Sequence, residues 1–134
     1  MNDMSIAGLA EAGGVGVETV RFYQRRGLMP TPPRPAGSGL GGGVRRYGAE
    51  DARRLRFIRA AQAAGFTLEE IAQLLTLDAT DDRRRAREMA RARTAALDAR
   101  IAELSAARAW LNQLAERCDE SAIGPCPIVA AFEG

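Results

Sequence analysis

Apolar positions recur every three or four residues along most of the chain, which is the spacing of amphipathic helices. The pattern predicts a short helix over residues 5–13 and a second over 17–26, separated by a glycine-containing turn. In the second helix Val17, Val20 and Phe22 are expected to face inward. Two short helices joined in this way are typical of a helix-turn-helix.

The outward side of the second predicted helix is polar and includes an aromatic ring among arginines. Its members are Thr19, Arg21, Tyr23 and Arg26. Residues 30–43 are rich in proline and glycine and exclude a helix. The strand-like run Val44-Arg45-Arg46-Tyr47 follows, so the loop is interpreted as a basic wing, with a plain linker as the alternative.

Helical periodicity resumes over residues 49–65, and Thr67 with Glu70 forms a capping-box pattern that opens another helix through Leu77. Residues 81–117 contain neither glycine nor proline and predict one long helix. Its coiled-coil seam is interrupted by Arg108 and consists of Leu97, Ile101, Leu104, Leu111 and Ala115. One chain has no second long helix to cover this seam, which favours a homodimer.

The expected fold class is therefore all-α, with a winged helix-turn-helix region over 1–77, a dimerisation helix over 78–117 and a C-terminal loop and helix over 118–134. No apolar run approaches the roughly 20 residues of a membrane span. The N-terminus lacks the basic start and apolar stretch of a signal peptide. We therefore expect a cytoplasmic protein without a membrane partner.

Composition and charge exclude several classes of function and favour others. The chain has no histidine, and all 19 of its basic residues are arginine, so His-based triads, His-ligated metals, P-loop lysines and Schiff-base lysines are excluded. An enzyme is accordingly disfavoured. Residues 1–60 carry a net charge of +5 and residues 61–134 a net charge of −3. This asymmetry favours a polyanion as the partner of the first half.

The two cysteines, Cys118 and Cys126, lie eight positions apart near the C-terminus. Counting back by sevens along the seam from Cys118 leads to Arg83. If two long helices pair antiparallel, Cys118 lies near Arg83 of the partner subunit, although the seam alone does not set that orientation. Without histidine, the thiols suit only soft metals at low coordination number. Buried or incidental thiols are the commoner interpretation of two cysteines taken alone.

Several stretches together resemble the MerR family of transcription regulators, most closely its mercury-responsive members. They are Val17–Leu28, Val44–Tyr47, Arg56–Ile71 and Cys126–Val129, and the resemblance covers essentially the whole chain. It implies a homodimer joined by an antiparallel coiled coil. It also implies that the dimer binds promoter DNA and distorts it for RNA polymerase when an inducer metal binds, so that the regulator both represses and activates a heavy-metal resistance operon.

The resemblance also assigns candidate residues. It places Thr19, Arg21 and Tyr23 on the groove-facing helix, and it places in the wing a second set consisting of Arg34, Arg45 and Tyr47. Base edges and phosphates are the targets of such helices and arginines. The glycine-rich stretch 37–43 lengthens the wing, and its role in DNA contact is left open.

The metal site departs from the family in one respect. Divalent sensors carry a third cysteine at the start of the long helix, where this chain has Arg83, and monovalent sensors share the spacing of Cys118 and Cys126. A two-thiol site sensing Hg(II) is favoured, with Cu(I), Ag(I) or Au(I) as the alternative because a partner arginine would stabilise an anionic dithiolate. An alternative function is a regulator that responds to thiol oxidation or to another signal. For Arg83 itself, the alternative is a solvated arginine at the start of the helix with no role in the site.

Overall fold

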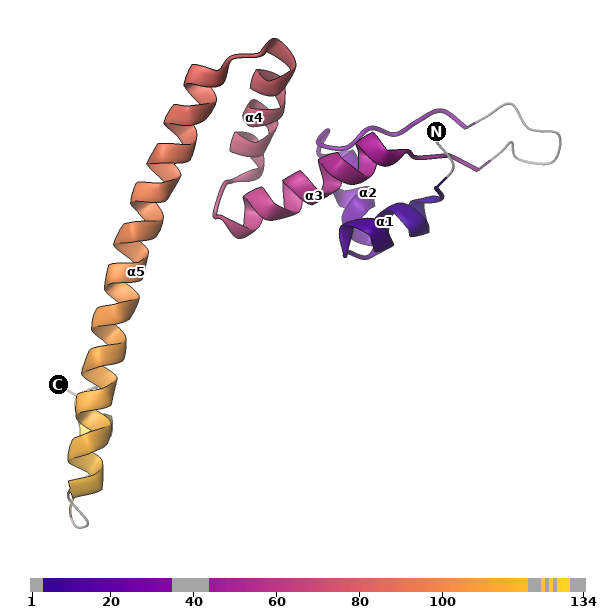
Figure 1. Ribbon diagram of the computed structural model, residues 1–134. Helices are drawn as coiled ribbons and strands as arrows, with labels where there is room; N and C mark the ends of the chain where they lie inside the picture. Colours follow the sequence, from indigo (N-terminus) through magenta and orange to yellow (C-terminus); the bar gives the residue numbers. More distant parts are fainter. Residues whose placement is uncertain (1–3, 35–43, 121–123, 125, 127, 131–134) are drawn as a thin grey trace. The chain divides into compact units, whose positions relative to one another are not determined.

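A computed structural model describes residues 4–34, 44–120, 124, 126 and 128–130. The chain divides into two compact units, Met1–Met89 and Ala90–Gly134. The named elements are α1 (Ile6–Gly13), α2 (Val17–Arg25), α3 (Ala49–Ala63), α4 (Leu68–Thr80) and α5 (Arg83–Glu120), shown in Figure 1. The expected all-α class is confirmed. Among the described residues, no helix is long and apolar enough to cross a membrane.

The helix-turn-helix forms where the sequence predicts it. Ser5 begins α1 by accepting a hydrogen bond on Oγ from the backbone N–H of Gly8 at 3.1 Å. Gly14 ends the helix in the left-handed conformation, with φ of 70°. Another left-handed glycine, Gly27 with φ of 75°, lies just beyond the end of α2. Gly14 lies in the turn that joins α1 to α2, and the two helices pack against each other.

The core of the first unit lies where α1, α2, α3 and α4 meet. Its largest fully buried side chains are Tyr47, Leu9, Leu28, Leu55, Ile58, Ile71 and Val20. The approach of α1 to α3 depends on a glycine. A Cβ built on Gly13 would lie 2.7 Å from Cγ of Leu55, whose own side chain is fully buried. Only glycine fits there without displacing that leucine.

The buried side of α2 differs from the prediction at Phe22 and Tyr23. Val20 and Tyr23 are the buried residues of this helix, whereas the Phe22 ring remains 37% exposed. Val20 and Tyr23 are three positions apart and therefore share one face. The prediction that Phe22 faces inward and Tyr23 outward is wrong, because Val20 sets the buried face and Phe22 lies off it.

The predicted strand after the wing is also wrong. In Val44–Tyr47 only Tyr47 makes a β-bridge, and its partner is Met4 at the start of the chain. The backbone N–H groups of Met4 and Tyr47 each donate to the other's carbonyl, at 3.0 and 2.8 Å. The bridge thus joins the N-terminus to the end of the wing. The glycine-rich stretch 37–43 lies outside the described residues.

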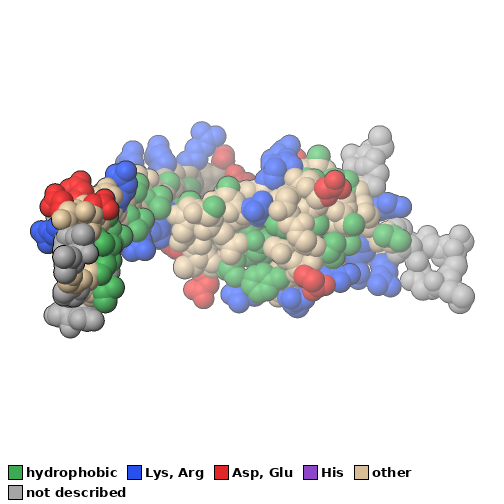
Figure 2. Space-filling model, turned by 90° about the horizontal axis from the view of Figure 1, so that it is seen from below, with side chains coloured by type: hydrophobic (Ala, Val, Ile, Leu, Met, Phe, Trp, Pro, Cys, Tyr) green, Lys and Arg blue, Asp and Glu red, His purple; other side chains and the backbone are tan. Residues whose placement is uncertain are grey.

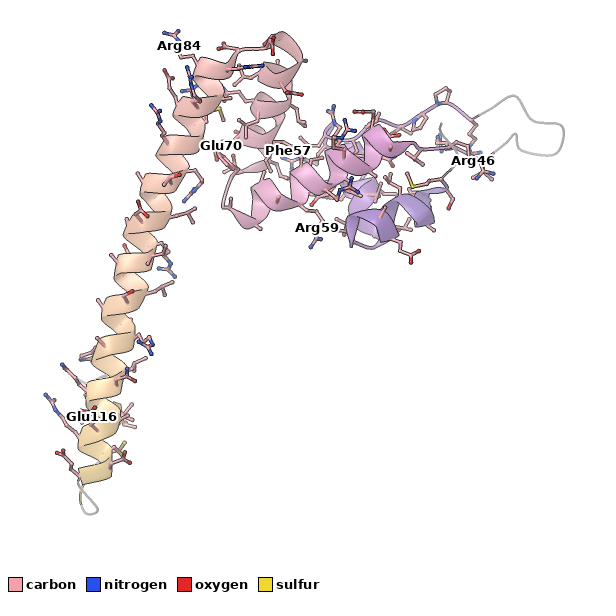
Figure 3. All side chains as sticks on the ribbon, in the orientation of Figure 1. Arg46, Phe57, Arg59, Glu70, Arg84 and Glu116 are labelled. Atoms are coloured by element: carbon pink, nitrogen blue, oxygen red, sulfur yellow. The ribbon has the colours of Figure 1, made fainter. Side chains whose placement is uncertain are left out.

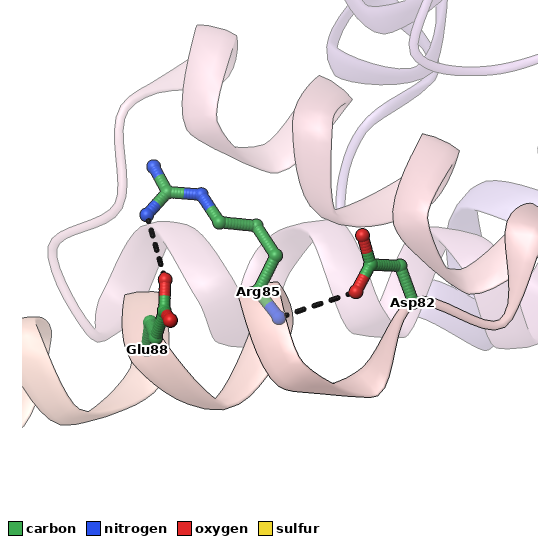
Figure 4. Close-up of polar contacts among 3 residues, drawn as sticks. All are labelled: Asp82, Arg85 and Glu88. Carbon is green, nitrogen blue, oxygen red and sulfur yellow. Dashed lines mark hydrogen bonds and ion pairs between the residues drawn. The ribbon is translucent and has the colours of Figure 1, made fainter.

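Helix α4 begins with the predicted capping box. Oγ1 of Thr67 accepts from the Glu70 backbone N–H at 3.1 Å, and the Glu70 carboxylate accepts from the Thr67 N–H at 2.8 Å. At the start of α5, the Asp82 carboxylate accepts from the backbone N–H of Arg85 at 3.4 Å (Figure 4). A carboxylate in that position stabilises the positive end of the helix dipole.

The second unit contains most of α5 and the described part of the C-terminal segment. Four predicted seam residues are exposed in the single chain: Leu97 at 38%, Ile101 at 60%, Leu104 at 53% and Leu111 at 45%. Figure 2 shows hydrophobic side chains along one side of the long helix at the end nearest the viewer. Helix α5 ends at Glu120, three residues later than the sequence predicts, so Cys118 lies on its last turn rather than in a loop.

Candidate nucleic-acid interface and metal centre

The exposed face of α2 is basic and contains one aromatic ring. Arg21, Arg25 and Arg26 are all exposed, and Arg21 forms an ion pair with Glu18 at 3.0 Å on the helix surface. The Arg26 guanidinium lies 6.0 Å from the centre of the Phe22 ring. Exposed ion pairs contribute little stability, so the guanidinium of Arg21 can exchange Glu18 for a phosphate or a base edge.

The predicted α2 and wing residues occupy different environments. Thr19 is partly exposed, and Arg34 is exposed at the last residue described before the wing. Arg46, which the sequence analysis did not single out, is exposed beside the point where the described chain resumes (Figure 3). Its signal in the sequence was the Arg45-Arg46 pair, whose members project to opposite sides of an extended backbone.

Tyr23 and Tyr47, both predicted as DNA contacts, are buried, at 4% and 1% exposure. The Tyr23 hydroxyl donates to Oε1 of Gln62 on α3. Burial raises the pKa of Tyr23, an effect that the charge of Arg59 partly offsets. Both rings were expected on the DNA-facing surface, and the structure instead assigns them to the core.

Three arginine side chains donate hydrogen bonds to backbone carbonyls of distant segments. Nε of Arg45 donates to the carbonyl of Pro32 at 2.9 Å and thereby joins the two sides of the wing at its base. Nε of Arg54 donates to the Leu28 carbonyl at 2.6 Å. Nη1 of Arg59 donates to the Gly13 carbonyl at the end of α1, at 3.0 Å. Arg45 thus uses its Nε at the wing base, and its contact with phosphate stays a prediction.

The two cysteines meet in the second unit. Cys118 on the last turn of α5 lies with its Sγ 3.7 Å from Sγ of Cys126, and both residues are partly buried. Cys126 precedes a helical turn over residues 128–130, and its carbonyl accepts from the Ala130 N–H at 3.0 Å. The chain thus turns after α5 and brings the second thiol back to the first.

The surroundings of the two thiols differ. The pKa of Cys126 is lowered, chiefly because the backbone N–H groups of Val129 and Ile128 stabilise its thiolate and because Cys118 adds a hydrogen bond. The pKa of Cys118 is raised, first by its hydrogen bond to Cys126 and then by the charge of that thiolate. Cys126 is therefore the first thiolate of the pair and the first ligand available to a soft cation.

The spacing of the sulfurs fits a shared metal ion. With metal–sulfur bonds of about 2.3 Å, the two sulfurs lie about 4.6 Å apart in a linear site and about 3.8 Å apart at a tetrahedral angle. The observed 3.7 Å therefore matches a bent arrangement and needs about an additional 1 Å of opening for a linear one. Among the residues that the structure describes, no group of three possible ligands occurs.

Arg83 stands where divalent sensors of the family carry their third cysteine. It is the first residue of α5 and belongs to the first unit. Its side chain is 86% exposed, and its Nε lies 4.0 Å from Oδ1 of Asp81. A contact this long between exposed groups holds the guanidinium weakly. The side chain can therefore reorient toward an anionic partner.

A helix-turn-helix with a basic exposed face and a wing base is typical of a DNA-binding protein, and the thiol pair adds two soft donor atoms. The family model "MerR HTH family regulatory protein" matches residues 4–77, and "MerR, DNA binding" matches residues 52–114. The chain belongs to the MerR family. It is a transcriptional regulator and not an enzyme.

Relatives match along the whole length. The mercuric resistance operon regulatory protein of Serratia marcescens is 37% identical over 100% of this chain and 90% of its own. The structure of the dual-function regulator MerR of Bacillus megaterium with mercury(II) is 32% identical, with a TM-score of 0.66 over 98% of this chain and 100% of that one. The lead(II) complex of the regulator PbrR691 of Ralstonia metallidurans is 31% identical, with a TM-score of 0.69 over 96% and 98%.

Proposed function

We propose that this protein is a metal-responsive transcriptional regulator of a heavy-metal resistance operon, with Hg(II) as its inducer. The observation that carries the proposal is the 3.7 Å separation of Cys118 and Cys126 in a chain that also holds a MerR-type DNA-binding region. The similarity to a mercuric resistance regulator over the full chain supports mercury. A soft dithiolate is also the ligand set that Hg(II) prefers.

Promoter DNA is bound by the exposed face of α2, with Arg21 and Arg25 as principal contacts and Thr19 beside them. Arginine forks suit guanine edges and phosphates, and the Phe22 ring supplies an apolar surface of the kind that contacts thymine methyl groups. Arg34 and Arg46 flank the wing and contact the backbone phosphates. Support comes from the exposure of these side chains on one basic unit.

The working form is a homodimer in which α5 pairs antiparallel with its copy. The exposed seam of Leu97, Ile101 and Leu104 supports pairing, because burial of one leucine side chain contributes about 1.5–3 kcal/mol. This arrangement brings the partner subunit's Arg83 to Cys118. The protein acts in the cytoplasm, and RNA polymerase engages the promoter once the metal-bound dimer has distorted the DNA.

A monovalent inducer, Cu(I), Ag(I) or Au(I), is the second candidate. A dithiolate with such an ion keeps a net negative charge, whereas a Hg(II) dithiolate is neutral. The weakly held, exposed guanidinium of Arg83 favours the charged complex if the partner subunit supplies it. Metal selectivity therefore depends on one arginine from outside the thiol pair.

The function is tested by transcription in vitro from a promoter that the protein selects from genomic DNA. Hg(II) is expected to raise the transcript level with the wild-type protein and to have no effect with Cys118→Ser or Cys126→Ser. Both variants should bind the same DNA with unchanged affinity, because the thiols lie in the second unit. Induction by Cu(I) and not by Hg(II) would establish the second candidate. Normal induction of either single variant would refute the two-thiol site.

A further inference from the structure

We propose that Cys118 and Cys126 also form a reversible disulfide within one chain, and that this disulfide makes the regulator unable to bind its inducer metal. The metal-excluding part rests on the proposed function, whereas the disulfide itself stands on the geometry of the thiols. The two Sγ atoms lie 3.7 Å apart, in hydrogen-bonding contact. No other cysteine exists in the chain, so a disulfide within it has only one connectivity.

The backbone around the pair permits the sulfurs to close. A disulfide needs an S–S distance of about 2.0 Å, so the sulfurs must approach by about 1.7 Å. Cys118 is held by the last turn of α5. Cys126 lies outside that helix, just after Gly124, whose φ of 105° is a conformation that glycine adopts without strain. Because Cys126 lies outside α5, its approach to Cys118 does not require the helix to unwind.

Both thiols are within reach of small reagents. Each cysteine is partly buried rather than enclosed in the core. The residues that separate them include Asp119 and Glu120, which belong to an exposed helix end. Free thiols that are accessible and stand beside a resolving thiol are the ones that oxidise reversibly. Structural cysteines lack at least one of these properties.

The oxidant is a hydroperoxide, and the thiol pair is oxidised in two steps. The thiolate of one cysteine attacks the terminal peroxide oxygen; the O–O bond breaks, and an alcohol or water leaves with one proton from solvent. The resulting sulfenic acid is then attacked by the second thiol, which forms the S–S bond and releases water. Two electrons pass from the thiol pair to the peroxide. A dithiol reductant reverses the change by exchange through a mixed disulfide.

The same two sulfur atoms would bind the metal and form the disulfide. Both sulfurs that would hold the metal are consumed by the disulfide, and a disulfide sulfur is not a thiolate ligand. Oxidation and metal binding are therefore mutually exclusive. A bound soft metal therefore protects the pair from peroxide, because a metal-ligated thiolate is not free to attack it.

The test uses the reduced, metal-free protein with all 134 residues, treated with stoichiometric hydrogen peroxide. Peptide mapping without reductant is expected to show a Cys118–Cys126 crosslink with a mass loss of two hydrogens, in a chain that runs as a monomer on a non-reducing denaturing gel. Hg(II) binding should fall at least tenfold and return after dithiothreitol. One equivalent of Hg(II) added first should slow crosslinking at least tenfold. Operator affinity of the oxidised protein, measured by anisotropy, checks that the DNA-binding unit is intact.

Cys118→Ser is the matched control, because it keeps Cys126 and removes its resolving thiol. This variant should stop at a sulfenic acid that a dimedone probe captures. Disulfides between chains as the main wild-type product, or sulfinic acid without a crosslink, would overturn the proposal. An intact crosslink together with unaltered Hg(II) binding would overturn the metal-excluding part. Failure of the reduced protein to bind Hg(II) would refute the proposed function while leaving the crosslink result independent.

Discussion

Nε2 of Gln24 donates to the hydroxyl oxygen of Tyr47 at 2.9 Å, and it also lies 3.1 Å from the carbonyl of Pro30. One side chain of α2 thereby contacts the chain on both sides of the wing. This amide therefore links α2 to described residues on both sides of the wing. Because Tyr47 is buried and paired to Met4, the same contact reaches the N-terminus.

Gln24→Ala is expected to lower both stability and DNA affinity, because it removes the contacts to Tyr47 and Pro30 together. Each hydrogen bond contributes about 1 kcal/mol, so the free energy of unfolding should fall by about 1–2 kcal/mol in urea titration. Tyr47→Phe removes only the bond to Tyr47 and should cost about half as much. Equal stability of Gln24→Ala and the wild type would show that the amide does not hold the wing.

Arg21→Ala is expected to weaken operator binding by about 1–3 kcal/mol at fixed salt, because an exposed guanidinium on α2 is lost. Tyr23→Phe is the informative comparison. Its ring is buried and its hydroxyl is bonded to Gln62, so it should lose about 1 kcal/mol of stability and keep its DNA affinity. Anisotropy with labelled operator measures both variants. A large affinity loss in Tyr23→Phe with normal stability would return Tyr23 to the DNA interface.

Gly13→Ala is expected to destabilise the first unit by about 1–3 kcal/mol, since the new methyl would overlap the buried side chain of Leu55. Gly8→Ala is the matched control in the same helix. There the nearest atom to an added Cβ is Oγ of Ser5 at 3.6 Å, so alanine should stabilise α1 by up to about 1 kcal/mol. Thermal unfolding of both variants checks the prediction, and equal shifts in one direction would contradict it.

Local chemistry in the sequence was enough to predict the helices. Thr67 and Glu70 form their capping box as expected, and glycine ends both short helices as the pattern indicates. These features depend on neighbours within four residues. The pairing of Cys118 with Cys126 was also open to prediction, because only one cysteine pair exists.

Features that depend on tertiary packing were not predicted. Phe is more hydrophobic than Tyr, so the sequence placed Phe22 inside. Tyr23 is buried instead, because it shares a helix face with the buried Val20 and because its hydroxyl donates a hydrogen bond to Gln62. The alternation in Val44–Tyr47 resembled a strand, yet a strand needs a neighbour along its length. Among the described residues only Met4 pairs with this run. No local signal identifies such partners.

Arg83→Cys is expected to broaden the response toward divalent ions, because it supplies a third thiol if the partner subunit's residue 83 lies beside Cys118. Zn(II) or Pb(II) should then induce transcription where the wild type shows no response. Arg83→Ser separates loss of the charge from gain of the thiol, and it should weaken only the monovalent response. Unchanged selectivity in Arg83→Cys would contradict the antiparallel placement of the two subunits.

The most direct test of the proposed two-thiol sensor is X-ray absorption on the reduced protein carrying less than one equivalent of Hg(II) per chain. Each mercury is expected to have two sulfur neighbours, and Cys118→Ser is expected to reduce this number to one. The same loss is expected in Cys126→Ser. A mercury coordinated mainly by oxygen or nitrogen, or a sulfur count unchanged by either substitution, would contradict the claim that Cys118 and Cys126 together bind the inducer.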